Sequence, residues 1–143
     1  MYSQEIIRNQ FRNASILLAN IDACNNQTTY NGVEIPITGQ PSGADLGRLV
    51  RKTSESMLSC SNKWRQLGLV GQSKNPDEYR RNVRNVRNAA QYLIQLFDNI
   101  SALVTMMDLG QDQSVLEMLS NMSQWRARVQ NFGNALSAQL EAE

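Results

Sequence analysis

Hydrophobic residues recur every three or four positions in four separate stretches of the chain. This period places apolar side chains on one face of an α-helix. The pattern predicts helices at about residues 3–24, 45–67, 76–109 and 114–140. The same alternation of four and three is typical of helices that pack side by side at shallow angles. We therefore expect an all-α chain with one helical domain over residues 1–143, either an up-down four-helix bundle or a long-helix antiparallel bundle.

The ends of these stretches carry residues that start or stop helices. Ser3 is a candidate N-cap for the first helix, and Asn75, which is followed by proline, is one for the third. Ser114, with a glutamate three residues later, has the spacing of a capping box for the fourth. Gly68 and Gly110 are expected to end the second and third helices. The last two connections are then short, which favours antiparallel packing of the helices that they join.

Residues 25–43, between the first two helices, form an insert without helical period. Its centre, residues 29–34, predicts a small β-hairpin, because Asn-Gly suits a two-residue type I′ turn. An isolated hairpin is marginal in water, so it has to pack on the bundle, on a copy of itself or on a partner. The insert is either a surface loop or a docking arm. In the second case four apolar side chains bind the partner: Tyr30, Val33, Ile35 and Ile37.

The composition excludes several kinds of binding and catalytic site. The chain has 14 basic and 13 acidic residues, no histidine and two cysteines. A charge near zero argues against a dedicated nucleic-acid coat or a polybasic membrane binder. The lack of histidine excludes imidazole metal ligands and histidine-based catalytic triads. No phosphate-binding or nucleophile motif is present. We expect a protein that is not an enzyme and that uses no cofactor and no metal.

The sequence also bears on the compartment. No apolar run approaches the roughly 20 residues that span a bilayer, and the N-terminus lacks the order of charged, apolar and small residues of a cleavable signal peptide. Cys24 and Cys60 have no metal-ligand spacing and fall at apolar helical positions, where free cysteine acts as a small hydrophobe. A cytoplasmic protein, or one inside a virus particle, is expected.

The densest run of charge lies early in the third predicted helix and contains Arg80, Arg81, Arg84 and Arg87. On a helix Arg80, Arg84 and Arg87 share one face, beside the apolar stripe rather than opposite it. They either cover the helix interface with their aliphatic stems or bind carboxylate or phosphate. These four arginines and the apolar residues of the insert are the predicted partner-binding residues.

An up-down topology would gather most basic residues at one end of the bundle and most carboxylates at the other. Such a charge split suits head-to-tail contacts between copies, or docking onto an acidic partner. The alternative is an ordinary solvated surface. The predicted basic end contains Arg8, Arg12, Lys63, Arg65, Lys74, Arg80, Arg81, Arg84 and Arg87.

These features favour a non-catalytic structural, assembly or adaptor protein, a repeated subunit of a larger complex such as a virus particle or a secretion machine. The surface is rich in amides, with 15 Asn and 13 Gln. This amide content and the small helical format generically resemble accessory proteins of bacteriophage particles, although no motif identifies a family. Two alternatives remain open: a binder of nucleic acid or an anionic surface through the arginine run, and a small helical export chaperone. If the protein is a structural, assembly or adaptor subunit, we expect it to bind other proteins or further copies of itself.

Overall fold

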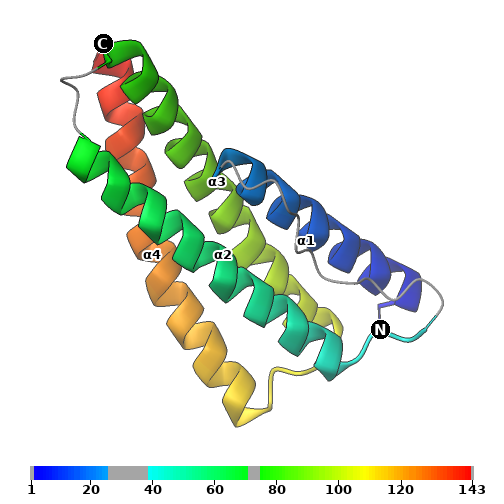
Figure 1. Cartoon of the computed structure of the whole chain (residues 1–143). Coiled ribbons are helices and arrows are strands. Elements are labelled where there is room, and N and C mark those ends of the chain that lie inside the picture. The colour runs from blue at the N-terminus through cyan, green and yellow to red at the C-terminus, as the bar shows by residue number, and fades with distance from the viewer. Residues whose placement is uncertain (1, 26–38, 71–74, 143) are drawn as a thin grey trace.

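The computed structural model describes residues 2–25, 39–70 and 75–142, and this part of the chain is all-helical (Figure 1). The predicted all-α class is confirmed. The hairpin predicted at residues 29–34 lies outside the described residues, as do the four apolar residues proposed for its docking role. The four helices are α1 (Gln4–Cys24), α2 (Gly43–Val70), α3 (Pro76–Met106) and α4 (Gln113–Ala142).

The helices begin at residues with local capping chemistry. The side chain of Ser3 accepts from the N–H three residues later at 3.2 Å, and Asn75 does the same at 3.1 Å, as predicted. At the start of α2 the carboxylate of Asp45 accepts the N–H of Ser42 at 2.8 Å. Burial acts to raise the pKa of Asp45, but hydrogen bonds from Ser42 and Arg48 outweigh it and lower the pKa. A charged carboxylate therefore fixes this helix start.

The end of α3 is a Schellman motif without glycine. Asp108 has φ 56° and is the non-glycine residue with positive φ in the described chain. Its N–H donates to the carbonyl of Thr105 at 3.1 Å, and the N–H of Leu109 donates to the carbonyl of Val104 at 3.0 Å. These two bonds define the motif. The predicted stop at Gly110 is therefore wrong, since the left-handed position falls two residues earlier.

Two other predicted helix ends also differ from the structure. Gly68 does not end α2, which continues to Val70. The cap of α4 is Asp112 rather than Ser114: the carboxylate of Asp112 accepts the N–H of Ser114 at 2.9 Å. An aspartate that already faces these N–H groups leaves no role for the predicted capping box.

The direction of α1 corrects the predicted up-down topology. Asn25, just after α1, donates through Nδ2 to Sγ of Cys60 in the second half of α2 at 3.3 Å. At the other end of α1, Arg8 donates to the carbonyl of Gly39, four residues before α2, at 3.4 Å. The two helices therefore run in parallel, as Figure 1 shows. A parallel pair needs a connection as long as the helices, and the long insert at residues 25–43 meets that need.

The other two connections do join antiparallel helices. Asn99 of α3 donates to the carbonyl of Gln10 in α1 at 3.2 Å, and Gln139 near the end of α4 donates to Tyr79 at the start of α3 at 3.1 Å. As a result α1, α2 and α4 all run in one direction and α3 runs in the other (Figure 1).

Helix α3 is the centre of the fold. It packs against each of the other three helices, and α1 also packs against α2. Eleven of its residues are buried, against three in α4. The largest fully buried side chains include Phe97, Leu93 and Ile100 of α3. Gly133 of α4 lies against α3, where a Cβ would meet the Cβ of Ala90 at 3.4 Å, so these two helices approach closely.

The Schellman motif gives a stability prediction. Because a Cβ is disfavoured at positive φ, Asp108→Gly should raise the free energy of unfolding by about 1 kcal/mol. Asp108→Ala keeps the Cβ and should give no such gain. Urea denaturation followed by circular dichroism measures both variants. Equal stability of the glycine variant and the unmodified protein would contradict the assignment of this residue as the left-handed cap.

Candidate functional site

The four arginines of the predicted cluster lie on the first turns of α3. Arg81 and Arg84 are exposed, whereas Arg80 and Arg87 are half-buried. Arg87 donates through Nε to Oδ1 of Asn88 at 3.0 Å. The helix thus brings these residues together.

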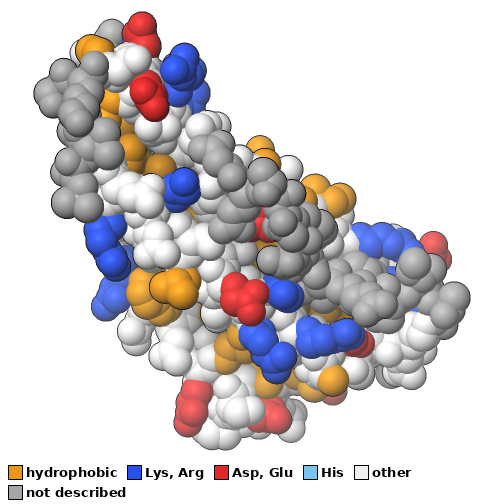
Figure 2. Space-filling model, viewed as in Figure 1, with side chains coloured by type: hydrophobic (Ala, Val, Ile, Leu, Met, Phe, Trp, Pro, Cys, Tyr) orange, Lys and Arg blue, Asp and Glu red, His pale blue; other side chains and the backbone are white. Residues whose placement is uncertain are grey.

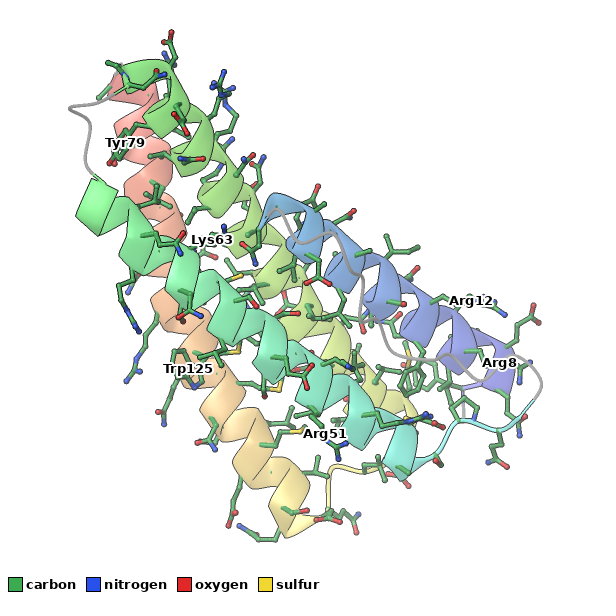
Figure 3. All side chains as sticks on the ribbon, in the orientation of Figure 1. Arg8, Arg12, Arg51, Lys63, Tyr79 and Trp125 are labelled. Carbon is green, nitrogen blue, oxygen red and sulfur yellow. The ribbon has the colours of Figure 1, made fainter. Side chains whose placement is uncertain are left out.

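The wider basic end forms only in part. Because α1 runs parallel to α2, Arg8 and Arg12 lie at the end of the bundle where α2 begins, far from the first turn of α3. Figure 3 shows both labelled at the opposite end from Tyr79. Lys63 of α2 does lie beside the start of α3, where it shares a hollow with Asn82 and Asn85. The placement of Arg8 and Arg12 in the basic end is therefore wrong, and the physical reason is the parallel crossover between α1 and α2. The charge split is weaker than predicted.

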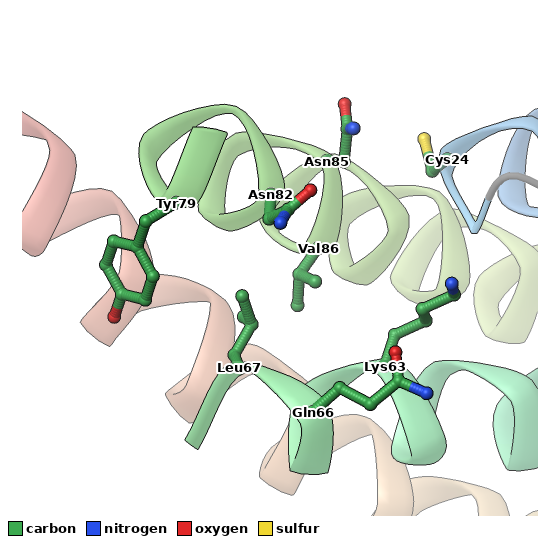
Figure 4. A pocket seen from close by; sticks show the side chains of 8 residues that line it. All are labelled: Cys24, Lys63, Gln66, Leu67, Tyr79, Asn82, Asn85 and Val86. Carbon is green, nitrogen blue, oxygen red and sulfur yellow. The ribbon is translucent and has the colours of Figure 1, made fainter. Parts of the chain in front are cut away.

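A small polar hollow of about 100 Å³ lies beyond the end of α1, between α2 and α3 (Figure 4). Cys24 of α1, Lys63 and Gln66 of α2, and Asn82 and Asn85 of α3 contribute to its wall. This volume holds about three water molecules. The lining holds one thiol and one amine, and no carboxylate is among the residues that line this hollow.

A wider opening is a groove between α2 and α4, which we call the α2–α4 groove. Hollows of about 460 Å³ and 380 Å³ adjoin along it and share Val50 and Met118. Its floor is Phe97 and Ile100 of α3. The walls of the larger hollow are Val50, Thr53, Ser54, Met57, Leu58 and Ser61 of α2, and Met118, Asn121, Met122 and Trp125 of α4.

The groove exists because α2 and α4 both pack on α3 but not on each other. Within the described chain, no Cα atom of α2 comes within 8 Å of one in α4. Side chains of the two helices meet near one end, where the tilted rings of Trp64 and Phe132 pack with their centroids 4.6 Å apart. Towards the other end the groove reaches Leu109 in the turn between α3 and α4.

Apolar side chains in this groove are only partly covered. Leu58 is 65% exposed and Trp125 is 41% exposed. The first four turns of α4 contain no fully buried residue, although Met118 and Met122 are packed partly against the core. Figure 2 shows a hydrophobic patch over α2 and α4, around the position where Figure 3 labels Trp125. The groove is therefore an apolar surface that the chain itself leaves open.

The sequence did not predict this groove. Val50, Met57, Met118, Met122 and Trp125 all belong to the periodic stripes, which were assigned to the core. A stripe shows which face of a helix is apolar but not whether a neighbour fills the space beside it. The available signal was Leu58, an apolar residue next to the stripe rather than in it.

The described residues offer little other chemistry. They contain no group of three or more His, Cys, Asp or Glu side chains that could hold a metal ion. Within the same ranges, none of the four helices combines the length and the apolarity that crossing a membrane requires. Comparison of the chain with protein-family models, curated proteins and solved structures finds no match.

The two cysteines are free thiols in different surroundings. Cys60 is fully buried, and burial raises its pKa to about 11; Asn25 opposes this rise, while Cys24 and Asp22 add to it. Cys24 is half-buried, and burial raises its pKa as well. Because the thiolate is the reacting form, both thiols should be poor nucleophiles at neutral pH.

Thiol titration tests these surroundings. At pH 8 a thiol with a pKa of about 11 is ionised to about one part in a thousand, so Cys60 should stay silent towards an aromatic disulfide reagent in the folded protein. Cys24→Ser isolates this thiol and should show no fast reaction. In concentrated guanidinium chloride the same variant should react at the rate of an ordinary thiol. A full equivalent released quickly from folded Cys24→Ser would contradict the packing of Cys60.

Proposed function

We propose that the protein is a non-catalytic protein-binding subunit, an adaptor or assembly component, and that the α2–α4 groove is its binding surface. The observation that carries the proposal is the open apolar groove itself. In a folded monomer, contiguous apolar surface of this kind marks an interaction site more often than it serves the fold.

The residue types of the groove support a protein ligand. Aromatic residues and methionine are enriched at protein interfaces, and flexible methionine side chains adapt to the shape of a partner. The groove offers Met57, Met118, Met122 and Trp125 together. Its long open form suits an extended structural element better than a small metabolite, which usually binds in a more closed cavity.

The class of function is the one that the sequence favoured. The proposed binding surface is different. The predicted basic end is divided between the two ends of the bundle, and the insert lies outside the described residues. The groove replaces both as the contact surface. An export chaperone would use the same groove for its substrate, so it remains within the proposal as one kind of protein-binding function.

Nucleic-acid binding through the arginine run is the competing hypothesis. Arg81 and Arg84 are exposed on one short part of α3 and are compatible with phosphate contacts. Only a few phosphates are within reach of the roughly two helical turns that carry the run. The described surface offers no row of aromatic residues beside them for base stacking. We therefore rank it second.

A designed peptide tests the groove directly. An 18-residue amphipathic helix, with leucine and methionine on one face and glutamine elsewhere, should bind the folded protein with micromolar affinity in a fluorescence anisotropy titration. Leu58→Glu should weaken this binding at least tenfold, because it places a charge where a leucine contact contributes about 1.5 kcal/mol or more.

Ile16→Glu is the matched control. Ile16 is 58% exposed on α1, close to the 65% of Leu58, but it lies outside the groove. This variant should bind the peptide like the unmodified protein. The proposal fails if the peptide does not bind at all, or if both variants weaken it equally.

A further inference from the structure

We propose that the natural occupant of the α2–α4 groove is an amphipathic helix of a partner protein that carries carboxylates on both sides of its apolar stripe. This inference rests on the proposed function, since it names the partner of the same groove. Three features of the described residues lead to it: the shape of the groove, the charge along its two edges, and the charge on the chain's own exposed apolar surface.

The shape fits a helix. The α2 wall runs from Gly43 to Ser61, which is about 27 Å of helix, or about five turns. The two walls are helices that run in the same direction, and the floor is a third helix. A helix laid between them would pack ridges into the grooves of both walls, as neighbouring helices of a bundle do. Its dipole would oppose those of both walls if it ran antiparallel to them.

The edge of the groove on α2 carries two arginines. Leu58 lines the groove, and Arg51 and Arg65 lie seven residues before and after it. Seven residues are almost two turns, so the three side chains follow one line along the helix. Both arginines are exposed.

The edge on α4 carries one further arginine. Arg128 lies seven residues after Asn121, which lines the groove, and its guanidinium sits over the ring of Trp125 at 5.2 Å from the centroid. Stacking on an aromatic ring fixes the guanidinium and leaves its N–H groups available to a carboxylate. The carboxylates on this side lie towards the start of α4: Asp112 lines the groove there as the cap of α4, and Glu117 is next to Met118.

These three arginines form no ion pair with a carboxylate of the described residues, whereas three other cations of the same helices do. Arg48 pairs with Asp45, Lys52 with Glu55 at 3.4 Å, and Arg126 with Asp98 at 2.9 Å. Arg51, Arg65 and Arg128 instead border the apolar surface. In Figure 2, basic side chains lie beside the hydrophobic patch over α2 and α4. A partner that covers the patch brings its own flanks next to these charges, so acidic flanks are complementary.

A second copy of the chain is less well matched. Outside the lining of the groove, the exposed large apolar side chains of the described chain are Tyr2, Ile6, Ile16 and Leu116. The two on α1 are Ile6 and Ile16. They lie beside Arg8 and Arg12 on the same helix. Placing this face in the groove would bring arginines against arginines, which opposes binding. The charges therefore favour a different chain as the occupant.

Three peptides with one apolar face test the charge preference. Their flanking positions are all glutamate, all glutamine or all lysine, and the length and the leucine and methionine positions are those of the designed helix above. At about 50 mM salt the glutamate peptide should bind at least tenfold more tightly than the glutamine peptide, and the lysine peptide more weakly than both. At about 500 mM salt the difference should fall below threefold, because the Debye length then shortens to a few ångströms.

Charge-reversal variants show which arginines cause the preference for the glutamate peptide. The double variant Arg65→Glu, Arg128→Glu should invert the preference in favour of the lysine peptide. Arg51→Glu, two helical turns before Leu58 on α2, should reduce the glutamate preference and leaves Arg128, which stacks on Trp125, unchanged. The control Arg81→Glu, Arg84→Glu changes as much charge on α3 outside the groove and should keep the original order of the three peptides. Circular dichroism establishes that each variant remains folded.

The outcomes separate the two proposals. Equal binding of all three peptides, or tightest binding of the lysine peptide, would overturn the acidic occupant and leave the groove as a binding surface. Failure of every peptide to bind would overturn both. Light scattering tests the second copy: a dimer of the unmodified protein that Leu58→Glu abolishes would assign the groove to self-association and overturn a partner helix.

Discussion

The packing of three parallel helices on one antiparallel helix is the constraint from which the other features follow. Because α3 supplies the shared core, each of α1, α2 and α4 is held mainly by its contact with α3 rather than by its neighbours. In a regular four-helix bundle every helix packs on two neighbours and the outer interfaces are closed. Here α2 and α4 do not approach each other along most of their length, and the groove between them is the direct result.

The sequence predicted the local structure well and the topology only in part. Helix positions, the caps at Ser3 and Asn75 and the two antiparallel connections follow from period, capping chemistry and short loops, which are properties of neighbouring residues. The direction of α1 depends on whether a long connection turns back or crosses over, and both choices satisfy the same apolar stripe. Asp108 shows the same limit on a smaller scale, since its left-handed conformation comes from the packing of the turn and not from the glycine that a pattern would favour.

The candidate site shows why the topology error mattered. The arginine run on α3 depends on one helix, and the structure brings its four members together as predicted. The basic end depended on the relative direction of two helices, so it lost Arg8 and Arg12 when that direction proved different. Predicting the groove required a third kind of information: how far apart α2 and α4 lie when both pack on α3. Met118 and Met122 have the same sequence pattern whether α2 covers them or not, and only the packing distinguishes the two cases.

The parallel arrangement also explains the carboxylates at one end of the bundle. A helix N-terminus favours negative charge, and the starts of α1, α2 and α4 all lie at that end. Glu5 lies in the first turn of α1, Asp45 in that of α2, and Asp112 caps α4. The pKa values of Asp45 and Asp112 are lowered by hydrogen bonds that hold their carboxylates at these helix starts. These acids therefore hold helix starts in place, and Asp112 does so at the end of the α2–α4 groove where α4 begins. Arg128, which stacks on Trp125, lies more than four turns further along α4.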